Sequence, residues 1–490
     1  MRLGVRPRAE QFGNVQINEL LRVIELDSGP SSPANGDIVV AREALTSIET
    51  QMAIVIPCMN EDYRTIEGVL LGIPHDCLVI LVSNSSRSPV DRYEAEVRLL
   101  DKFCADAQRY AIALHQNDGG AAAAFEAAGM PDLVCLEDGQ RKIRKGKGEA
   151  MIMGIALCQI AKKKWYVCLI ITPLDALTLC ANIGFIDADN YVPGSVHEYC
   201  KVFAAGLYAA VSPRSMVRIA WNSKPKVRNN RLFFDKKGRS SKVVNEWLNR
   251  LLQERTGFGT DLIQTGNAGE HAFSMRLGLE LRFATGYAIE PYEIINILEK
   301  FSGAKLEHQS VAHNSGAGSA AASSSPGLVQ IFQTETQNPH FHDASKGEDH
   351  VLKMQMQGLN AIYHSPLINE PLRAELRKYM MEQGELHEGE EPTRERVYPP
   401  VGSLDFEDLA VRLSAEAASL RQVDGRGTEA NATFAFRQGQ NNGQNLGQQI
   451  PALPAPVIAA HLAAHQQRQR MAQIALQQRI AQQQQQQHDA

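Results

Sequence analysis

Two short apolar runs separated by one helical segment restrict the architecture of this chain more than any other feature. Residues 53–57 (AIVIP) and 78–84 (LVILVSN) are rich in Val and Ile and end in turn residues, which is typical of buried parallel strands. Between them, Ile66, Val69 and Leu70 recur at helical spacing. Because strand, helix and strand in this order form a βαβ unit, the sequence predicts an α/β fold with a mostly parallel central sheet.

Composition places the chain among ordinary globular proteins. Its 490 residues are 44% hydrophobic and 21% charged, and the formal net charge of −5 lacks the basic excess of dedicated nucleic-acid or anionic-membrane binders. The eight cysteines are scattered without a CxxC pair, which favours buried thiols over a disulfide framework or a zinc site. No signal-peptide segment is visible, and the apolar stretch 167–181 is shorter than the roughly 20 residues that a membrane span needs. We therefore expect a cytoplasmic protein that binds neither nucleic acid nor membrane.

Two carboxylates follow the apolar run at residues 184–186. Asp187 and Asp189 lie two positions apart, so they share one face of an extended chain. At the carboxyl end of a parallel strand, both face the crevice in which α/β folds bind ligands. A divalent cation that bridges to diphosphate oxygens would relieve their mutual repulsion, so the pair predicts a metal site. The alternative for an isolated DxD pair is an acidic turn.

A basic loop precedes a predicted helix. Residues 141–151 (RKIRKGKGEAM) place five Lys and Arg side chains around two glycines. Glycine lets the backbone approach phosphate closely, and a helix N-terminus favours anions. The spacing is not that of a Walker A loop. The segment predicts a phosphate contact, with a solvated basic loop as the alternative.

Three further segments carry polar groups that suit a ligand site. The strand ends at 56–62 (IPCMNED) and 83–87 (SNSSR) lie where this class of sheet holds the base and ribose of a nucleotide. Residues 265–273 (TGNAGEHAF) supply backbone amides at two glycines. His340 and His342 share a face if the chain is extended, and one imidazole could join the acid pair, although a surface pair of histidines is more often inert.

Six segments containing these motifs resemble mannosyl-3-phosphoglycerate synthases and occur in the same order. They are VIPCMNEDYRTIEGVLLGIPHDCLVILVSNS, RKGKGEAM, GFIDADNYVPG, KPKV, TGNAGEHA and NPHFH. The resemblance covers roughly residues 15–375, about three quarters of the chain, and several segments are too long for chance to be a good explanation.

This resemblance implies a GT-A glycosyltransferase with a Rossmann-like nucleotide-sugar-binding architecture. It implies a hexosyltransferase that moves mannose from GDP-mannose to 3-phosphoglycerate with retention of configuration. The product is the phosphorylated precursor of mannosylglycerate, a compatible solute. The implied cofactor is a divalent metal, for which Mg²⁺ is preferred over Mn²⁺ or Co²⁺. A homodimer is one possible assembly.

The resemblance also implies roles for individual residues. The guanosine pocket would be formed by Pro57, Met59, Asn60, Glu61, Ser83 and Asn84, and the diphosphate would be approached by Lys145, Gly146 and Lys147. The metal would be held by Asp187 and Asp189 with one of His340 and His342, of which His340 is preferred. The mannose and acceptor side would be lined by Thr265, Gly266, Asn267 and Glu270. The phosphate and carboxylate of the acceptor require fixed positive charge, for which the candidates are Arg218, Lys224, Lys226 and Arg228.

The predicted catalytic carboxylates are Glu270 and Asp189. No second carboxylate clearly pairs with Glu270. We therefore favour attack by the acceptor hydroxyl on the same face of the sugar as the one from which the phosphate leaves, and that phosphate takes the hydroxyl proton. The alternatives are a related transferase with another donor sugar, a nucleotidyltransferase, and a non-catalytic protein of the same fold.

The expected organisation has four parts. A lead-in at 1–50 precedes a nucleotide-sugar-binding half at 51–200. An acceptor-binding and metal-completing half at 201–375 contains a flexible Ser/Ala/Gly insert at 309–327. The remainder, 376–490, is expected to be a largely disordered extension with a Gln-rich end. The apolar segment 167–181 departs from the family pattern and, if it displaced the acid pair, would reduce activity.

Overall fold

The computed structural model describes residues 1–4, 8–26, 37–169, 182–228, 231–235, 238–257, 259–303, 308–312, 327–341, 348–384 and 386–425. All of these belong to the first of two compact units, Met1–Arg437; the second unit is Gln438–Ala490. In the described residues, no helix is both long and apolar enough to cross a bilayer.

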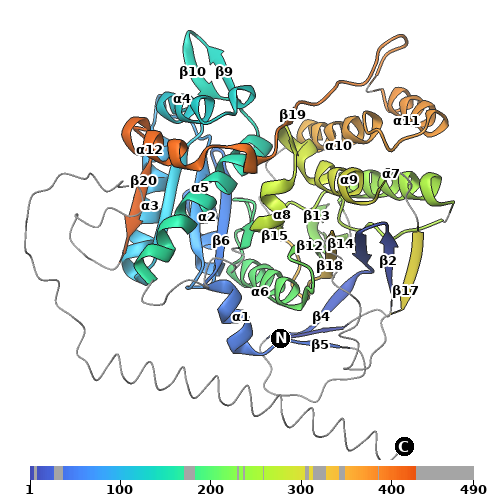
Figure 1. Cartoon of the computed structure of the whole chain (residues 1–490), viewed down its shortest axis with the longest axis horizontal. Helices are drawn as coiled ribbons and strands as arrows, with labels where there is room; N and C mark the ends of the chain where they lie inside the picture. Colours follow the sequence, from blue (N-terminus) through green and yellow to red (C-terminus); the bar gives the residue numbers. More distant parts are fainter. Residues whose placement is uncertain are drawn as a thin grey trace, which may run out of the picture. The chain divides into compact units, whose positions relative to one another are not determined.

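Four neighbouring parallel strands form one side of the large sheet (Figure 1). Their order in the sheet is β11-β6-β7-β8, and the pairs β11–β6, β6–β7 and β7–β8 are all parallel. The strands and the helices that connect three of them are β6 (Met52–Cys58), α2 (Tyr63–Gly72), β7 (Leu78–Ser83), α3 (Arg92–Ala107), β8 (Tyr110–His115) and β11 (Asn182–Phe185). The predicted βαβ unit is therefore confirmed.

The direction of the sheet changes beyond β11. β15 (His271–Ser274) is antiparallel to both β11 and β12 (Arg214–Ala220), whereas β12 is parallel to β18 (Val329–Glu335). The described sheet has 14 strands and is mixed, with one run of parallel pairs from β11 to β8 and a second group of parallel pairs around β18. Loops that leave β11 and β15 consequently start from opposite ends of adjacent strands.

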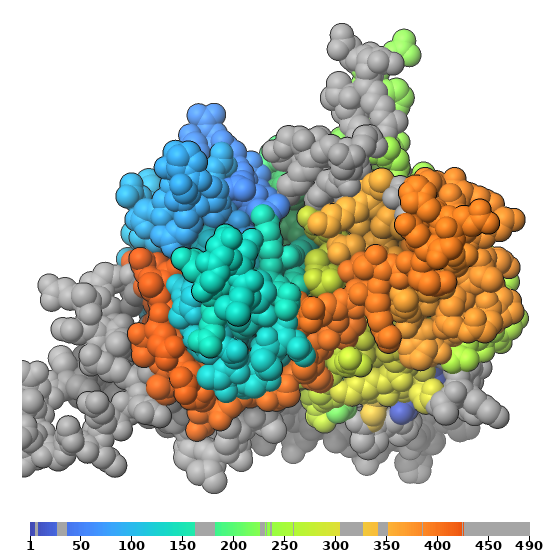
Figure 2. Space-filling view, turned by 90° about the horizontal axis from the view of Figure 1, so that it is seen from above, coloured from blue at the N-terminus to red at the C-terminus, as the bar shows by residue number. Residues whose placement is uncertain are grey.

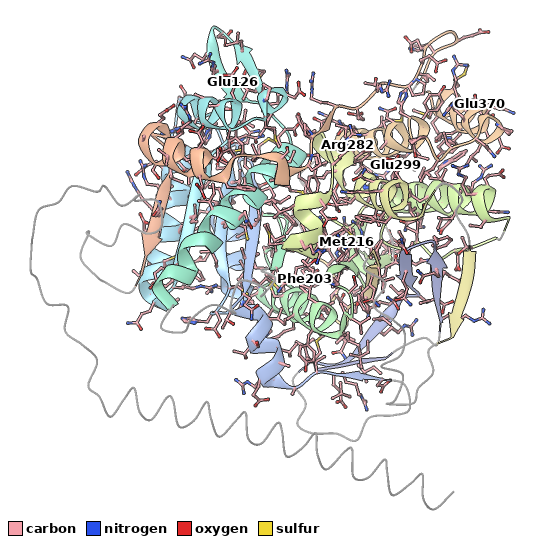
Figure 3. The ribbon with its side chains drawn as sticks, viewed as in Figure 1. Glu126, Phe203, Met216, Arg282, Glu299 and Glu370 are labelled. Carbon is pink, nitrogen blue, oxygen red and sulfur yellow. The ribbon has the colours of Figure 1, made fainter. Side chains whose placement is uncertain are left out.

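Helices cover both faces of the sheet and create two hydrophobic cores. Because side chains alternate along a strand, Val55 and Ile80 enter one core while Ile54 and Val79 enter the other. The first core is closed by α4 (Gly119–Ala127), α5 (Lys147–Leu169), α7 (Arg239–Thr256), α8 (Met275–Glu280), α9 (Ile289–Phe301) and α10 (Glu348–Tyr363). The second is closed by α1 (Arg42–Glu49), α2, α3 and α6 (Pro193–Ala209). Figure 3 labels one residue of each core, Met216 of the first and Phe203 of the second.

The first 50 residues are part of the sheet, which corrects the expectation of a lead-in. β3 (Val15–Asn18) and β4 (Leu21–Glu25) both pair in parallel with β18, and β2 (Arg8–Phe12) continues the sheet to β17 (His308–Ala312). Two short strands, β1 (Arg2–Gly4) and β5 (Ile38–Val39), extend it beside β4. The apolar alternation of these short strands was too brief to be read as sheet from the sequence.

The segment after residue 376 is also packed, as far as residue 425. It comprises most of α11 (Glu370–Glu382), then β19 (Val397–Tyr398), the short helix η4 (Val401–Ser403), α12 (Phe406–Glu416) and β20 (Arg421–Asp424). β20 pairs antiparallel with β8 at the edge of the sheet. Figure 2 shows residues 386–425 in orange and red, crossing the surface from beside α10 and α11 to the region of α4. The sequence-based prediction therefore placed the start of the disordered extension, residue 376, too early in the chain.

Two predicted inserts lie mostly outside the described residues. Residues 167–169 of the apolar segment form the last turn of α5, and 170–181 are not described. In the predicted flexible insert, 309–312 belong to strand β17, and 313–326 are not described.

The remaining short elements are two hairpins and three small pieces. The hairpins are β9 (Val134–Glu137) with β10 (Gln140–Ile143), and β13 (Lys224–Arg228) with β14 (Arg231–Asp235). The small pieces are η1 (Pro131–Leu133), β16 (Phe283–Ala284), which pairs with β19, and η3 (Gly286–Ala288).

Candidate active site

The carboxyl ends of the four parallel strands open into one pocket of about 370 Å³. β6 contributes Pro57 to Met59, β7 is followed by Asn84, β8 by Gln116, and β11 by Asp187 to Asp189. Strand ends of this kind form the ligand crevice of α/β sheets. The pocket has the size of a cavity that holds a small organic ligand.

Most of the site residues predicted from the sequence meet in this pocket. Those that line it are Pro57, Met59, Glu61, Asn84, Lys145, Gly146, Lys147, Asp187, Asp189, Lys224, Asn267 and His340. They come from segments that are far apart in the sequence, so the fold itself brings them together.

Lys147 connects the two acidic sides of the pocket. Its Nζ lies 2.5 Å from Asp187 Oδ1 and 2.7 Å from Glu290 Oε1. Burial of Lys147 disfavours its charge, but the two carboxylates outweigh that cost and raise its pKa well above the usual value. The ammonium at the start of α5 therefore stays charged.

The glycine at position 269 gives the acid pair its space. A Cβ on Gly269 would lie 2.4 Å from Asp187 Oδ2, so any side chain at this position would force the Asp187 carboxylate to shift. The TGNAGEHA motif therefore allows the loop before β15 to pass directly against the carboxylate of Asp187.

Two buried side chains fix the basic loop. The amide Nε2 of Gln116 donates to the carbonyl oxygens of Arg144 (2.6 Å) and Gly146 (3.2 Å). Glu149, fully buried in the first turn of α5, accepts hydrogen bonds from Thr285 Oγ1, from the Gly286 amide and from Tyr398 Oη. Lys145 and Lys147 line the pocket, but Arg141 and Lys142 do not. Arg141 instead pairs with Glu126, and Lys142 pairs with Glu137. Only part of the predicted basic cluster therefore faces the pocket.

Removing the Tyr398 hydroxyl is expected to weaken this arrangement. In Tyr398→Phe, the buried Glu149 carboxylate loses one of its three donors, and we expect the free energy of unfolding to fall by about 1.5–3 kcal/mol. Urea denaturation would measure this loss. Tyr208→Phe, at a more exposed tyrosine, serves as the matched control, and equal stability of the two variants would contradict the role assigned to Tyr398.

Glu270 lies behind the pocket wall. It is fully buried, and its carboxylate accepts hydrogen bonds from Asn190 Nδ2 (2.7 Å) and Trp221 Nε1 (3.0 Å). Burial, reinforced by the negative charge of Asp187, raises the pKa of Glu270 to about 7. The structure thus places Glu270 where it holds Asn190, which also donates to the carbonyl oxygen of Asp187 (3.2 Å), and Trp221, which lines the pocket.

His340 stands against Trp221 at the edge of the pocket. The two rings stack with centroids 3.9 Å apart, and His340 Nδ1 lies 3.2 Å from the hydroxyl of Tyr199. Its backbone amide donates to the carbonyl oxygen of Ser223 (2.8 Å). The imidazole is thereby held with little rotational freedom. His342 lies outside the described residues.

The structure corrects the prediction for Arg218, which is fully buried rather than available to an acceptor. Its guanidinium pairs with Glu293 at 2.7 Å and donates to the carbonyl oxygens of Thr265, Gly266 and Glu290. Glu293 also binds His271 Nε2 at 3.0 Å. Alternation along β12 directs Arg218 into the core, where it ties the TGNAGEHA loop to α9.

We expect Arg218→Met to destabilise the protein by about 3–5 kcal/mol, because Glu293 would remain buried without its cation. Arg98→Met provides the control, since the Arg98–Glu94 pair is largely exposed and should contribute less than about 1 kcal/mol. Thermal and denaturant unfolding measure both values. Similar losses of unfolding free energy in the two variants would show that the buried Arg218–Glu293 pair stabilises the protein no more than the exposed pair does.

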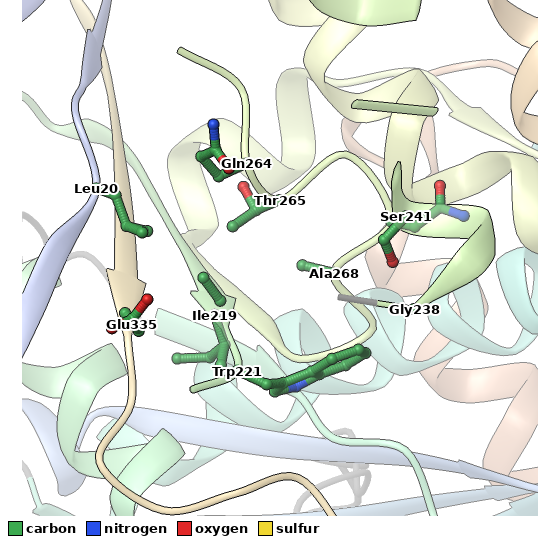
Figure 4. Close-up of a pocket in the computed structure, with 11 residues that line it drawn as sticks. Leu20, Ile219, Trp221, Gly238, Ser241, Gln264, Thr265, Ala268 and Glu335 are labelled. Carbon is green, nitrogen blue, oxygen red and sulfur yellow. The ribbon is translucent and has the colours of Figure 1, made fainter. Parts of the chain in front are cut away.

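The remaining predicted acceptor residues divide into three groups. Thr265 and Asn267 line a second, smaller pocket of about 60 Å³ (Figure 4), and Trp221 and Asn267 line the main pocket too. Gly266 lines neither pocket; its amide donates to Asn245 Oδ1. Lys226 and Arg228 lie in β13, and the structure describes only their backbone.

Two predicted guanosine residues shape the loops rather than line the pocket. Asn60 has a φ of +65°, a left-handed conformation that Asn tolerates, and its Oδ1 accepts the Ser86 amide. Ser83 is fully buried, and its Oγ accepts the Ser85 amide at 3.1 Å. Both hold the β6 and β7 loops together.

Several lining residues were not predicted from the sequence. They include Gln116, Trp221, Thr285, Gly286, Tyr287, Glu290, Lys353 and Gln357. Gln116 follows the strand YAIALH, so the strand-end rule that selected Asn84 would also have selected it. Glu290, Lys353 and Gln357 come from α9 and α10, whose helical pattern carries no sign of a site.

The residues at the acid pair fit a divalent cation in donor chemistry. Asp187, Asp189 and His340 line one pocket and offer oxygen and nitrogen ligands, and Asp187 already contacts an ammonium. Among the residues described here, no three His, Cys, Asp or Glu side chains group closely enough to hold a metal ion by themselves. This favours a cation that takes its other ligands from phosphate and water, as Mg²⁺ commonly does.

A pocket across parallel strand ends, with an acid pair after one strand and a basic loop opening a helix, is a ligand crevice of the α/β class. The model of the mannosyl-3-phosphoglycerate synthase family matches residues 5–413, so the chain is a glycosyltransferase. It belongs to the mannosyl-3-phosphoglycerate synthase family.

Two relatives support this assignment. The mannosyl-3-phosphoglycerate synthase of Pyrococcus furiosus is 39% identical over 401 residues, covering 81% of this chain and 93% of that protein. The enzyme of the same name from Aeropyrum pernix is 32% identical over 405 residues, covering 82% and 95%. A crystal structure of mannosyl-3-phosphoglycerate synthase from Rubrobacter xylanophilus is a more distant match, with 15% identity, a TM-score of 0.38 and coverage of 73% and 91%.

Proposed function

We propose that this chain transfers mannose from GDP-mannose to 3-phosphoglycerate, with retention of the anomeric configuration and release of GDP. The observation that carries the proposal is the acid pair Asp187 and Asp189 facing Lys147 in one pocket at the strand ends. Such a pocket can hold a diphosphate between fixed positive charge and a cation.

On the donor side, the proposal assigns the diphosphate to the start of α5. Lys145 and Lys147 line the pocket there, and the loop before them is held by Gln116. The nucleoside would lie across the ends of β6 and β7, against Pro57, Met59 and Asn84. The Oε1 of Gln116 is buried without a hydrogen-bond partner among the described residues, so it is available to a donor group of the ligand.

Asp187, Asp189 and His340 would hold a divalent cation, with Mg²⁺ ahead of Mn²⁺ or Co²⁺. When bound, this ion would neutralise negative charge on the leaving diphosphate.

On the acceptor side, positive charge and polar groups surround Trp221. Lys224 Nζ lies 4.8 Å from the centroid of the Trp221 ring and lines the main pocket, where it can meet a phosphate or a carboxylate. Asn267 is 5% exposed, and its Oδ1 has no partner among the described residues. An acceptor hydroxyl that donated to this oxygen would satisfy it.

The reaction breaks the bond between the anomeric carbon and the β-phosphate oxygen, and the acceptor hydroxyl oxygen forms the new bond. We favour attack from the side on which the phosphate leaves, with the hydroxyl proton passing to a phosphate oxygen. Lys147 stabilises the negative charge that develops on the leaving group. Glu270 positions Trp221 and Asn190 around the acid pair from behind the wall.

The test is GDP release by the purified full chain with GDP-mannose and Mg²⁺, with and without 3-phosphoglycerate. We expect release that depends on the acceptor, and an α-linked product by NMR. Parallel reactions with UDP-glucose and GDP-glucose measure the donor preference. Absence of acceptor-dependent GDP release from folded protein would refute the proposal, and release of pyrophosphate instead would identify a nucleotidyltransferase.

A further inference from the structure

Lys147 and a divalent cation compete for the same carboxylate. The ammonium lies 2.5 Å from Asp187 Oδ1, a contact distance for an ion pair, and Asp187 is the carboxylate proposed to meet the metal. Two positive charges so close together repel strongly in a buried site. With Lys147 in this position, Asp187 is therefore a poor metal ligand.

The position of Lys147 is held from the other side by a rigid anchor. Glu290 Oε1 lies 2.7 Å from Nζ, and Glu290 is 2% exposed. The Glu290 carbonyl oxygen accepts a hydrogen bond from Arg218 at 3.0 Å, and Arg218 is itself paired with the buried Glu293. The ammonium thus bridges one carboxylate on a fixed helix and one on the loop after β11.

The backbone around Lys147 places the ammonium beside the diphosphate. Lys147 is the first residue of α5, between Gly146 and Gly148. A Cβ on Gly148 would lie 2.2 Å from the Ala284 carbonyl oxygen, so the start of α5 is pressed against the segment before η3. The backbone at this point has little freedom, whereas the long lysine side chain can turn from Asp187 to a phosphate oxygen without moving it.

We propose that Lys147 is the internal counter-ion of the acid pair in the donor-free enzyme, and that the nucleotide diphosphate draws it away so that Asp187 can bind the metal. The enzyme then binds metal weakly by itself and tightly together with the nucleotide. This inference rests on the proposed function, since it assumes that the pocket binds a nucleoside diphosphate and a divalent cation.

The experiment measures Mn²⁺ binding to the full chain by calorimetry and by the EPR signal of free Mn²⁺, without nucleotide. Lys147→Gln removes the charge and keeps an amide that can donate to both carboxylates. We expect it to bind Mn²⁺ at least about tenfold more tightly than the unmodified chain. Lys147→Arg, which keeps the charge, should stay weak. Lys145→Gln is the matched control, because Lys145 lines the same pocket but forms no ion pair with Asp187 within the described residues.

A second comparison separates the proposal from a folding defect. In Lys147→Gln, the buried Glu290 carboxylate loses its counter-charge, and this could destabilise the variant. The double variant Lys147→Gln/Glu290→Gln is therefore compared with the single variant Glu290→Gln, because neither carries the Glu290 charge. Tighter Mn²⁺ binding should persist there. With GDP added, the gain in Mn²⁺ affinity should be larger in the unmodified chain than in Lys147→Gln, because GDP no longer has a lysine to remove in the variant.

Two results would overturn the inference. One is an unchanged or weaker Mn²⁺ affinity in Lys147→Gln, and the other is an equal gain in Lys145→Gln, which would indicate only a general change in charge. Because these measurements need no sugar transfer, they can fail while acceptor-dependent GDP release succeeds. If GDP and Mn²⁺ both fail to bind the unmodified, folded chain, the proposed function itself has failed.

Discussion

Asp187→Asn is expected to lower kcat/KM for the donor by about a thousandfold, or roughly 4 kcal/mol of transition-state stabilisation. The substitution removes a carboxylate from the acid pair and also removes the negative charge from the 2.5 Å ion pair with Lys147 at the start of α5. Both changes act where negative charge develops on the leaving diphosphate. Steady-state GDP release over a range of GDP-mannose and Mg²⁺ concentrations provides the measurement.

The matched control is Asp76→Asn, at an exposed aspartate paired with His75 outside the pocket. This variant should retain the activity of the unmodified chain. If Asp187→Asn kept more than about a tenth of that activity, the acid pair would be an acidic turn rather than a catalytic feature.

A chain that ends at Glu395 is expected not to fold, whereas a chain that ends at Arg437 should be as stable as the full chain. The shorter form loses β19, α12 and β20, and with them five buried side chains: Tyr398, Val401, Leu404, Leu409 and Leu413. At roughly 1.5–3 kcal/mol each, their burial is worth about 10 kcal/mol, which equals the whole stability of a typical domain.

Polar contacts add to this loss. The Ser419 amide donates to Asp118 Oδ2 (2.6 Å), and the hydroxyl of Tyr93 donates to the Ser419 carbonyl oxygen (2.5 Å). Far-UV circular dichroism and thermal unfolding of both truncated forms give the test. An equal unfolding midpoint for the two would mean that residues 396–425 contribute nothing to the fold.

The strand ends were the part of the site most accessible from the sequence. Apolar runs followed by Asn84 or by Asp187 and Asp189 identify both a buried strand and the polar group at its end, since one local pattern encodes both. The fold class was accessible for the same reason. The resemblance to a known family then supplied Lys147 and His340, which no local rule would have selected over their neighbours.

The misses have a common physical origin. Arg218 was a candidate acceptor ligand because the acceptor requires fixed positive charge, but its charge is taken up by Glu293, in a helix 75 residues away. Glu290 and Tyr398 reach the start of α5 through contacts of still longer range, to Lys147 and Glu149. The early strands were missed because each is short, and because two of them, β3 and β4, pair with β18, which lies far along the chain.

That pairing has a consequence for synthesis on the ribosome. The side chain of Asn18 donates to the carbonyl oxygen of Ile331, 313 residues later, and β3 and β4 have their parallel partner only in β18. The first strands to leave the exit tunnel must therefore wait with open edges until most of the chain has been translated. Contacts of such long range slow folding and expose unpaired strands to other chains. Nascent copies of this protein are thus expected to depend on chaperones until β18 emerges, although the parallel strands β6, β7 and β8 are complete much earlier.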